Sequence, residues 1–434
     1  MTKESKPNSR IGFNLKWLYP GMRIKRWILL LILGILLIAS GLAGGLLTLR
    51  SGNVASLQAK VLGTAYILDF IIGVWLVVQA VKKIFRSIVT LFLPQKEDNF
   101  IDIVYKKRQL ARGPKIVTVG GGTGLSTILH GLKEHTDHNN AIVTVADDGG
   151  SSGILRKQFD IPPPGDIRNC LVALADAEPL MHKLFQFRFD KDSKFEGHSF
   201  GNLFITVMTQ LTGDFEQAIK ESSKVLAIRG HVIPSTLSNV ALVATNTDGT
   251  LTEGEAKIAE AKRTINKVEL RPADNTATPE AISAINDADI IVLGPGSLYT
   301  SIIPNLLIRE ITQAVVKSKA LKFYICNIMT EHGETDNFSA SDHIRALIAH
   351  SHPRIVDYCI INNGTIPKDL IEKYKLEEAS FVTPDADKIR SLGYKVLADN
   401  LVSIEGPGPV RHNAIKLAQM VMTVFSKKRY AKSR

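Results

Sequence analysis

The sequence contains only three cysteines among its 434 residues, and their positions suit neither a disulfide framework nor a zinc site. Cys170, Cys326 and Cys359 lie far apart, and none belongs to a CxxC pair. An odd number of isolated cysteines is typical of reduced, buried thiols in a cytosolic compartment. We therefore expect no disulfide and no zinc ligand set.

Excess positive charge is absent from most of the chain. The formal net charge is +11, but residues 1–115 hold eighteen Lys and Arg against five Asp and Glu, whereas residues 116–434 hold thirty-five against thirty-seven. A nucleic-acid-binding domain needs a basic surface to contact the phosphate backbone. We therefore expect no nucleic-acid partner.

Charge is also almost absent from two N-terminal runs, which predict a membrane anchor. Residues 27–49 carry no charged side chain, and residues 61–80 carry only Asp69. Each run can cross a hydrocarbon core of about 30 Å, and the first exceeds the apolar region of about 7–15 residues found in signal peptides. Basic residues flank both outer ends, whereas the intervening loop offers only Arg50 and Lys60. By the positive-inside rule, we expect a multi-pass protein of the cell membrane with both termini and the main domain on the cytoplasmic side.

These patterns predict the following organisation: a basic cytoplasmic N-terminus (1–26), a two-helix transmembrane hairpin (27–80), a basic juxtamembrane linker (81–113), a soluble domain (114–425) and a basic tail (426–434). The linker mixes Lys and Arg with short apolar runs, which is typical of a segment that lies on anionic lipid. The lipid bilayer is therefore an expected partner.

The soluble part alternates short β-rich runs with helical patterns. We expect strands at 115–119, 141–146, 289–293, 321–326 and 356–361, and helices at 126–134, 280–286, 306–317 and 342–350. This alternation predicts an α/β fold with a doubly wound, mostly parallel sheet.

The first expected strand leads into GGGTGLS, residues 120–126. This segment lacks the third glycine of the dinucleotide fingerprint and the lysine of the P-loop, so it predicts neither motif. Glycines still allow the backbone to approach a phosphate, and the following helix presents free N–H groups. A phosphate site and a plain tight turn are both compatible with these residues.

The second expected strand leads into DDGGSSG, residues 147–153. Ligands of doubly wound folds bind at the carboxyl ends of the strands, so this loop should border the same crevice as the glycine loop. Ser151 and Ser152 can donate to phosphate oxygens, whereas Asp147 and Asp148 need a cation or a sugar hydroxyl between them and a phosphate. A bridging Mg²⁺ and a hydroxyl contact are both open, and capping of a helix accounts for one of the pair at most.

Three further loops, PPPGDIRN (162–169), HSFGN (198–202) and LGPGSLYTS (293–301), have the same polar or small character. They complete a set of five loops that predicts a ligand bearing phosphate. The candidate ligand-binding residues of these loops are Gly120, Gly121, Gly122, Thr123, Gly124, Asp147, Asp148, Ser151, Ser152, Asp166, Arg168, Asn169, His198, Asn202, Gly296, Ser297, Thr300 and Ser301.

The segments VTVGGGTGLS, VADDGGSSG, PPGDIRNCLVALA, GHSFGNL and GPGSLYTSIIPNL resemble the YvcK-like branch of the CofD family, the gluconeogenesis factors. The resemblance covers residues 115–425 and leaves the N-terminal hairpin outside. It implies a Rossmann-like fold, binding of a UDP-type nucleotide sugar, and a regulatory role in carbon metabolism, cell shape and envelope synthesis. It implies no established reaction, so we expect no catalytic residue and no required cofactor.

The sister branch of this family, the 2-phospho-L-lactate transferases, moves a phospholactate group from a guanylated donor to a deazaflavin with a divalent metal. In that alternative, Asp147 and Asp148 would bind Mg²⁺. GGSSG and PGSLYTS depart from the transferase pattern, which favours a binding regulator. The resemblance also implies that Arg411, in PGPVRHN, pairs with a pyrophosphate. For Tyr374 two roles are open: its ring stacks on a base or sugar of the ligand, or it is an exposed tyrosine on a helix. The expected partners also include a second copy of the chain, in a homo-oligomer.

Overall fold

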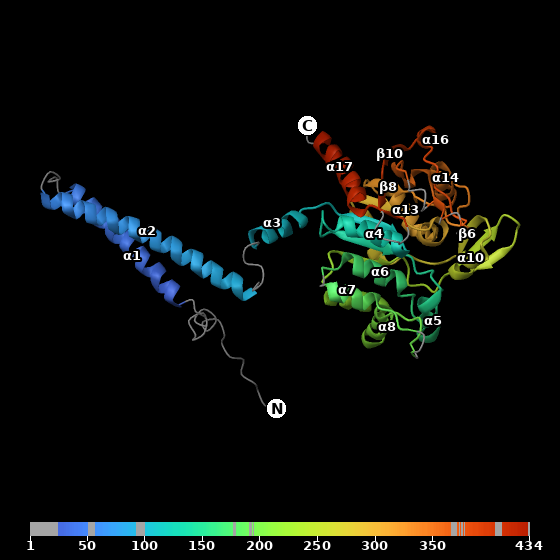
Figure 1. Ribbon diagram of the computed structural model, residues 1–434, viewed down its shortest axis with the longest axis horizontal. Helices are drawn as coiled ribbons and strands as arrows, with labels where there is room; N and C mark the ends of the chain where they lie inside the picture. Colours follow the sequence, from blue (N-terminus) through green and yellow to red (C-terminus); the bar gives the residue numbers. More distant parts are fainter. Residues whose placement is uncertain are drawn as a thin grey trace, which may run out of the picture. The chain divides into compact units, whose positions relative to one another are not determined.

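The computed structural model describes residues 25–50, 57–92, 100–176, 179–190, 193, 195–365, 371–372, 374, 376, 378–403 and 410–432. Its contacts divide the chain into two compact units, Met1–Lys107 and Arg108–Arg434. Both units are drawn in Figure 1.

The first unit contains a pair of long apolar helices, α1 (Lys25–Arg50) and α2 (Leu57–Phe92). Glycines bring their backbones together: a Cβ on Gly34 would lie 2.9 Å from the carbonyl oxygen of Gly73, and a Cβ on Gly73 would lie 2.7 Å from that of Gly34. Close approach at small residues is a common way for apolar helices to associate. Both helices are long and apolar enough to cross a membrane. The predicted basic N-terminus up to residue 24 and the loop at 51–56 lie outside the described residues.

Helix α3 (Phe100–Leu110) leads into the second unit, which is built on a seven-stranded sheet of order β10-β9-β8-β7-β1-β2-β3. All six neighbouring pairs are parallel. The strands are β1 (Ile116–Gly120), β2 (Asn139–Val143), β3 (His231–Pro234), β7 (Ile290–Leu293), β8 (Leu321–Ile325), β9 (Tyr358–Asn362) and β10 (Lys395–Asp399). The predicted Rossmann-like α/β fold is therefore confirmed. The five inner strands were predicted from the sequence, whereas the edge strands β3 and β10 were not.

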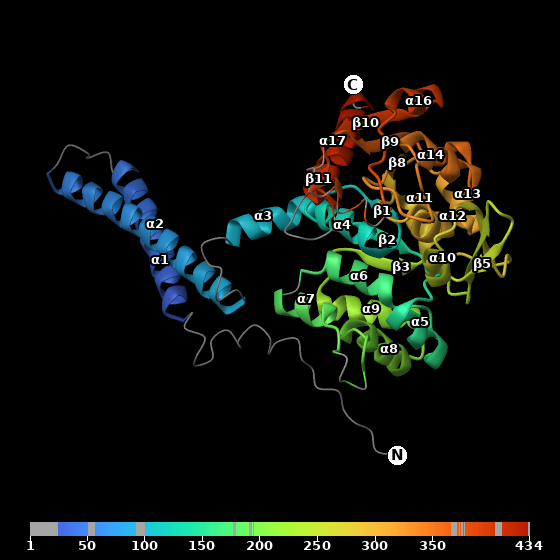
Figure 2. The same cartoon turned by 45° about the vertical axis from the view of Figure 1, so that its right-hand side comes forward.

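Helices cover both faces of the sheet (Figures 1 and 2). Successive residues of β1 point to opposite faces, so Val117 and Val119 belong to one core cluster and Ile116 to the other. The first face is covered by α11 (Pro279–Asp287), α12 (Ile303–Leu307), α13 (Arg309–Lys317) and α14 (Ala340–Ala349). The second is covered by α4 (Gly122–Leu132), α6 (Gly165–Leu174), α9 (Phe215–Leu226) and α17 (Ala414–Lys432). Further helices of this unit include α5 (Gly150–Phe159), α7 (Pro179–Gln186), α8 (Phe200–Thr212) and α16 (Ala386–Ser391).

Several local features differ from the sequence-based expectation. The helix expected at 306–317 is interrupted at Ile308, whose backbone is extended (φ −72°, ψ 105°). An antiparallel sheet, β5-β4-β6, and helix α10 (Glu255–Ala261) are inserted between β3 and α11. Its strands are β4 (Ala241–Asn246), β5 (Leu251–Glu253) and β6 (Ile265–Arg271), and none was expected. A two-stranded ribbon, β11 (Val402–Ser403) and β12 (Arg411–His412), lies near the C-terminus of the domain.

Candidate functional site

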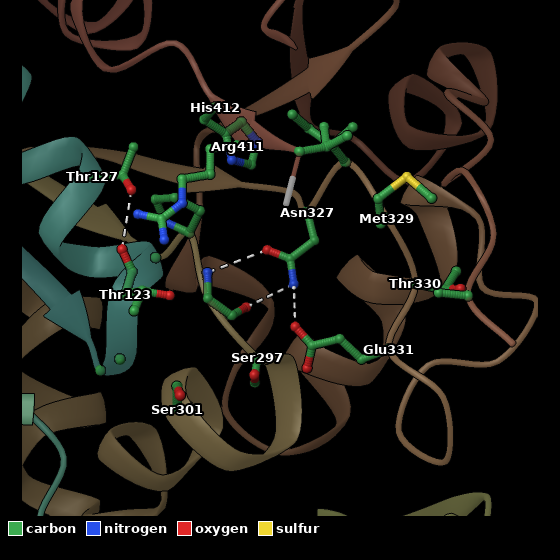
Figure 3. Close-up of a pocket in the computed structure, with 18 of the residues that line it drawn as sticks. Thr123, Thr127, Ser297, Ser301, Asn327, Met329, Thr330, Glu331, Arg411 and His412 are labelled. Atoms are coloured by element: carbon green, nitrogen blue, oxygen red, sulfur yellow. Dashed lines mark hydrogen bonds between the residues drawn. The ribbon is translucent and has the colours of Figure 1, made fainter. Parts of the chain in front are cut away.

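The strand order reverses between β1 and β7. From β1 the sheet continues through β2 and β3, and from β7 it continues through β8 to β10 on the other side. Such a switch point opens a crevice at the carboxyl ends of the strands. A cavity of about 590 Å³ lies there (Figure 3). It is lined by Gly121, Gly122, Thr123, Gly124, Thr127, Asp147, Asp166, Glu255, Pro295, Gly296, Ser297, Ser301, Asn327, Ile328, Met329, Thr330, Glu331, His332, Tyr374, Ala379, Val410, Arg411 and His412.

One wall of the cavity is the N-terminus of α4, which begins four residues earlier than the sequence predicted. Gly121, the residue before this helix, has no side chain that could cap it. The Gly122 N–H donates to the Asp166 carboxylate, and the next N–H groups of the first turn have no acceptor within the helix. Gly122 has φ +62°, which favours glycine. A Cβ on Gly124 would lie 2.5 Å from the carbonyl oxygen of Pro295, so only glycine allows α4 to approach the loop after β7 this closely.

A second wall is the ribbon strand β12. The backbone N–H of Val410 donates to the Tyr374 hydroxyl at 2.6 Å, and His412 Nε2 lies 3.1 Å from the carbonyl oxygen of Cys326. Burial lowers the pKa of His412 to about 4, so this imidazole is neutral at physiological pH. Arg411 is therefore the positive group of this wall. Figure 3 shows its guanidinium on the side of the cavity formed by Thr123 and Thr127.

A third wall is the loop after β8. Asn327 holds this loop to the loop after β7, because its Oδ1 accepts from the Gly296 N–H at 3.2 Å and its Nδ2 donates to the Gly296 carbonyl at 2.9 Å. The same Nδ2 donates to Glu331 Oε1 at 3.2 Å (Figure 3). Asn327 thereby fixes both the backbone of Gly296 and the carboxylate of Glu331.

Carboxylates also line the cavity. Burial and then the charge of Asp147 raise the pKa of Asp166 to about 6, and burial raises the pKa of Asp147 itself. Burial and the surrounding carboxylates raise the pKa of Glu255 well above its usual range. Among the described residues, Glu255 Oε2 has no hydrogen-bond partner. This side of the cavity is therefore suited to groups that donate hydrogen bonds or carry positive charge.

The two adjacent aspartates have separate roles. Asp147 lines the cavity and accepts the N–H of Gly149 at 2.9 Å. Asp148 instead accepts the N–H of Ala256 at 2.9 Å and so caps the start of α10. Asp147 therefore shares the cavity with Asp166, Glu255 and Glu331, and Asp148 does not line it. The capping alternative thus applies to Asp148, although the capped helix is distant in sequence.

Several predicted site residues lie in a separate polar network, where α5, α6 and α8 meet. Ser151 Oγ lies 2.9 Å from His198 Nδ1 and accepts from Asn202 Nδ2 at 3.1 Å. Arg168 donates to Asn202 Oδ1 at 2.9 Å and to Asn169 Oδ1 at 2.8 Å. None of these five residues lines the cavity. In this structure they hold three helices together.

Three more predicted residues also lie behind the cavity wall. Gly120 is the last residue of β1, and its carbonyl accepts from Asn305 Nδ2 at 3.1 Å. Ser152 is buried beside Asp147, to which it donates a hydrogen bond. Thr300 lies in the π-helix Leu298–Ile302 and donates to Glu334 Oε1 at 3.2 Å.

Two of the hydroxyl groups that were predicted to bind a ligand after β7 already contact acidic side chains. Ser297 is hydrogen-bonded to Glu331, and Thr300 to Glu334. A phosphate placed at the start of the π-helix would have to displace these hydrogen bonds. The part of α4 beside Arg411 is the better place for a phosphate (Figure 3).

The loop after β8 and Glu255 line the cavity but were not among the residues predicted from the sequence. The strand 321–326 was expected, and polar residues follow it directly, so the rule used for the other strand ends would have found Asn327 and Glu331. Glu255 lies between β5 and β6 of the inserted antiparallel sheet, which no pattern had indicated, so no sequence signal placed it at the crevice.

A metal site made by the protein alone is not present among the described residues, because no three His, Cys, Asp or Glu side chains lie close enough to hold one ion. Mg²⁺ commonly binds through one or two carboxylates together with the phosphates of a nucleotide. Asp147 and Asp166 could therefore hold Mg²⁺ only together with the phosphates of a bound nucleotide.

Comparisons with known proteins identify the family of this domain. The family model described as 2-phospho-L-lactate transferase CofD matches residues 116–402. The gluconeogenesis factor of Bacillus subtilis is 46% identical over 316 residues, which are 73% of this chain and 99% of that protein. A crystal structure of a Bacillus halodurans protein superposes with a TM-score of 0.70 at 46% identity, covering 72% of this chain and all of that one.

Other relatives extend over the N-terminal unit as well. A protein of Clostridium acetobutylicum is 42% identical over 425 residues, which are 95% of this chain and 92% of its own. Relatives therefore occur both with and without the region that precedes the sheet. The chain belongs to the CofD family, in which its relatives from Bacillus subtilis and Halalkalibacterium halodurans are named gluconeogenesis factors.

Proposed function

We propose that this chain is a membrane-anchored regulator that binds a nucleotide sugar of the UDP type without turning it over. The observation that supports this proposal is the division of the cavity into two chemically different ends. One end has Arg411 and the start of α4, where Asp166 accepts the Gly122 N–H, and the other has the carboxylate of Glu331 (Figure 3). A nucleotide sugar carries both matching groups, a diphosphate and a set of hydroxyls.

The diphosphate belongs at the α4 end. The Gly122 N–H donates to Asp166, and the next N–H groups of the first turn have no acceptor within the helix. These groups and the positive end of the helix dipole favour a negative group there. The guanidinium of Arg411 can contact two phosphate oxygens at once, and the Thr123 and Thr127 hydroxyls lie on the same side of the cavity (Figure 3). Tyr374 lines the cavity next to Arg411, so its ring is available for stacking on a base or sugar.

The sugar hydroxyls belong at the carboxylate end. Asn327 holds the Glu331 carboxylate in place, and a hydrogen bond from a neutral donor to a charged acceptor contributes about 1.5–3 kcal/mol. Identification of the base as uracil rests on the family resemblance, as does the role in cell shape and envelope synthesis. The role in carbon metabolism is supported further by the names of the relatives.

Anchoring in the membrane is part of this proposal. It is supported by the length and apolar composition of α1 and α2 and by their close packing at glycines.

Calorimetric titration of the detergent-solubilised full chain with UDP-sugars tests the binding function. We expect Arg411→Ala to weaken binding at least tenfold, because it removes the cation opposite α4. Arg345→Ala is the matched control, since Arg345 is exposed and pairs with Asp342 outside the cavity. Failure of every UDP-sugar to bind, or equal binding by both variants, would refute the proposal.

The second candidate is a Mg²⁺-dependent phosphate-group transferase that acts on a deazaflavin. It is favoured by the family model and by the shared position of Asp147 and Asp166 at the cavity. Mg²⁺ held by these carboxylates and by nucleotide phosphates would stabilise negative charge on the transferred group. The residues of this chain would supply the two carboxylates and Arg411.

Binding measurements with a chelator separate the two candidates. A regulator that uses hydroxyl contacts should bind UDP-sugars equally with and without EDTA. A transferase should bind guanylated phospholactate in an EDTA-sensitive way, and Asp147→Asn should abolish that sensitivity. Binding of guanylated phospholactate but not of UDP-sugars would decide for the transferase.

A further inference from the structure

The end of helix α17 carries a group of basic residues that does not contribute to the core of the sheet domain. The first half of this helix is held in the core by Leu417 and Val421, which are fully buried, whereas residues 426–431 are all exposed. In both views α17 leads outward from the sheet toward the C-terminus (Figures 1 and 2). We call the four basic residues at the end of the helix the α17 basic end: Lys427, Lys428, Arg429 and Lys432.

No acidic residue near it in the sequence neutralises the α17 basic end. The last acidic residue of the chain is Glu405, so residues 406–434 contain seven Lys and Arg and no Asp or Glu. Of the earlier basic residues in this stretch, Arg411 lines the cavity and Lys416 pairs with Asp399 at 2.8 Å. The described side chains of the α17 basic end, in contrast, form no ion pair with any other described residue.

Neutralisation of the helix dipole does not account for all of this charge. The dipole acts within the last turn of a helix, and Lys427 and Lys428 precede the last turn of α17. Positive charges on consecutive residues also repel one another, and a helix end without packing contacts is only marginally stable in water. A negatively charged partner would remove this repulsion and stabilise the helix end.

The bilayer is a negatively charged surface within reach of α17 when the chain is anchored by α1 and α2. Only residues 93–115 separate α2 from β1, and 11 of them form α3. With about 1.5 Å for each helical residue and about 3.5 Å for each extended residue, this connection spans at most about 60 Å. An anchored chain therefore keeps its sheet domain near the membrane, which raises the effective concentration of lipid headgroups at α17.

The chemistry of the α17 basic end also suits a lipid surface. The cytoplasmic leaflet carries anionic lipids that attract clusters of Lys and Arg, and the predicted topology puts the sheet domain on that side. Tyr430 lies within the cluster and is 76% exposed, and tyrosine is enriched where headgroups meet the hydrocarbon. A nucleic acid would need a broader basic surface, whereas residues 116–434 hold slightly more acidic than basic residues.

We propose that the α17 basic end binds anionic lipid headgroups of the bilayer in which α1 and α2 are anchored. This proposal rests on the proposed membrane anchoring and adds a second, reversible contact to it. Because the contact is electrostatic, it holds the sheet domain at the membrane surface in a way that depends on lipid charge and on salt.

Fluorescence quenching in proteoliposomes tests the contact. The three native cysteines are buried, so Ala431→Cys in the full chain provides one accessible thiol for a fluorophore. In vesicles with brominated acyl chains we expect quenching when phosphatidylglycerol is present, and none in pure phosphatidylcholine or at high salt, which screens the charges. A fluorophore at Gln210→Cys, an exposed position on α8, should stay unquenched in all vesicles. Equal quenching at both positions would show non-specific adsorption of the domain and contradict the proposal.

Removal of charge supplies the matched comparison. Quenching at residue 431 should be lost in a triple variant of the α17 basic end: Lys427→Gln, Lys428→Gln and Arg429→Gln. The control variant removes the same charge at three exposed positions on and just after α13 and should retain the quenching: Arg309→Gln, Lys317→Gln and Lys319→Gln.

Flotation of the same vesicles separates this proposal from the membrane anchoring. A chain that floats with both kinds of vesicle but is not quenched in anionic ones, or a triple variant quenched like the wild type, would overturn the lipid contact and leave the anchoring intact. A chain that floats with neither would overturn both. Fluorescence that responds to added RNA and not to lipid charge would identify nucleic acid as the partner of α17 and would also overturn the proposal.

Discussion

At the scale of single residues, the adjacent aspartates show how neighbouring side chains acquire different functions. Asp147 is held at the cavity by Gly149 and Ser152, whereas Asp148 accepts the N–H of Ala256 from a helix more than one hundred positions later in the chain. Asp148 thus links the loop after β2 to α10, which places Glu255 at the cavity.

Replacement of Asp148 by alanine should therefore lower stability. The variant leaves an N–H at the start of α10 without its acceptor, and loss of a helix cap costs about 1 kcal/mol. Chemical denaturation of the full chain measures this change. Asp274→Ala, at an exposed position, is the control. Equal midpoints for Asp148→Ala and the wild type would show that the contact is energetically unimportant.

Asp166 should make the stability of the protein pH-dependent. Burial and the charge of Asp147 raise the pKa of Asp166 from 3.8 to about 6. Between about pH 4 and pH 6 the folded state binds the proton more strongly than the unfolded chain, so stability falls as pH rises through this range. Above pH 6 the ionised Asp166 lowers the free energy of unfolding by a constant amount, on the order of 3 kcal/mol, because one pKa unit corresponds to about 1.4 kcal/mol.

The variant Asp166→Asn tests this effect. It removes the titrating group and retains an oxygen that can accept the Gly122 N–H. We expect it to be more stable than the wild type at pH 7–8, and the difference to vanish near pH 4. Thermal unfolding across this range measures the difference. Parallel pH profiles for the two proteins would rule out Asp166 as the titrating group.

At the scale of elements, the start of α4 brings the chain close enough for ligand contact. Gly122 has φ +62°, where a β-branched residue is strongly disfavoured. Gly122→Val should weaken nucleotide-sugar binding at least tenfold, or about 1.4 kcal/mol, because the first turn of α4 must change its backbone.

Gly213→Val is the matched control for this variant. Gly213 ends α8 at φ +73°, has open space around its Cα and lies outside the cavity. Both variants should lose comparable stability, and only Gly122→Val should lose affinity in calorimetric titration. Equal affinities would show that the glycine segment acts as a turn only.

At the scale of the whole molecule, the predicted topology is open to labelling in intact cells. With both termini cytoplasmic, a membrane-impermeant maleimide should label Asn53→Cys and should leave Ser5→Cys and Ser426→Cys unlabelled. Asn53 and Ser5 lie outside the described residues, and Ser426 lies on α17. Labelling at residue 426 would exclude the topology.

Much of the fold followed from local sequence patterns. The five inner strands are apolar, because parallel strands are covered on both faces, and such runs are visible without a structure. The edge strands β3 and β10 were missed, since β3 is only four residues long and β10 is partly exposed. Neither proline nor glycine stands at the helix break at Ile308, so the break was not evident from the sequence.

The sequence by itself determined the strand-end loops, the glycines at the start of α4 and the two apolar N-terminal helices, because each depends on residues close together in the chain. Only the tertiary structure decided which candidates share the cavity. It turned Asp148 toward α10, placed Ser151 and His198 in a network between helices, and brought Asn327 and Glu331 to the crevice. These outcomes depend on contacts between distant segments, and local periodicity does not encode which segments pack together.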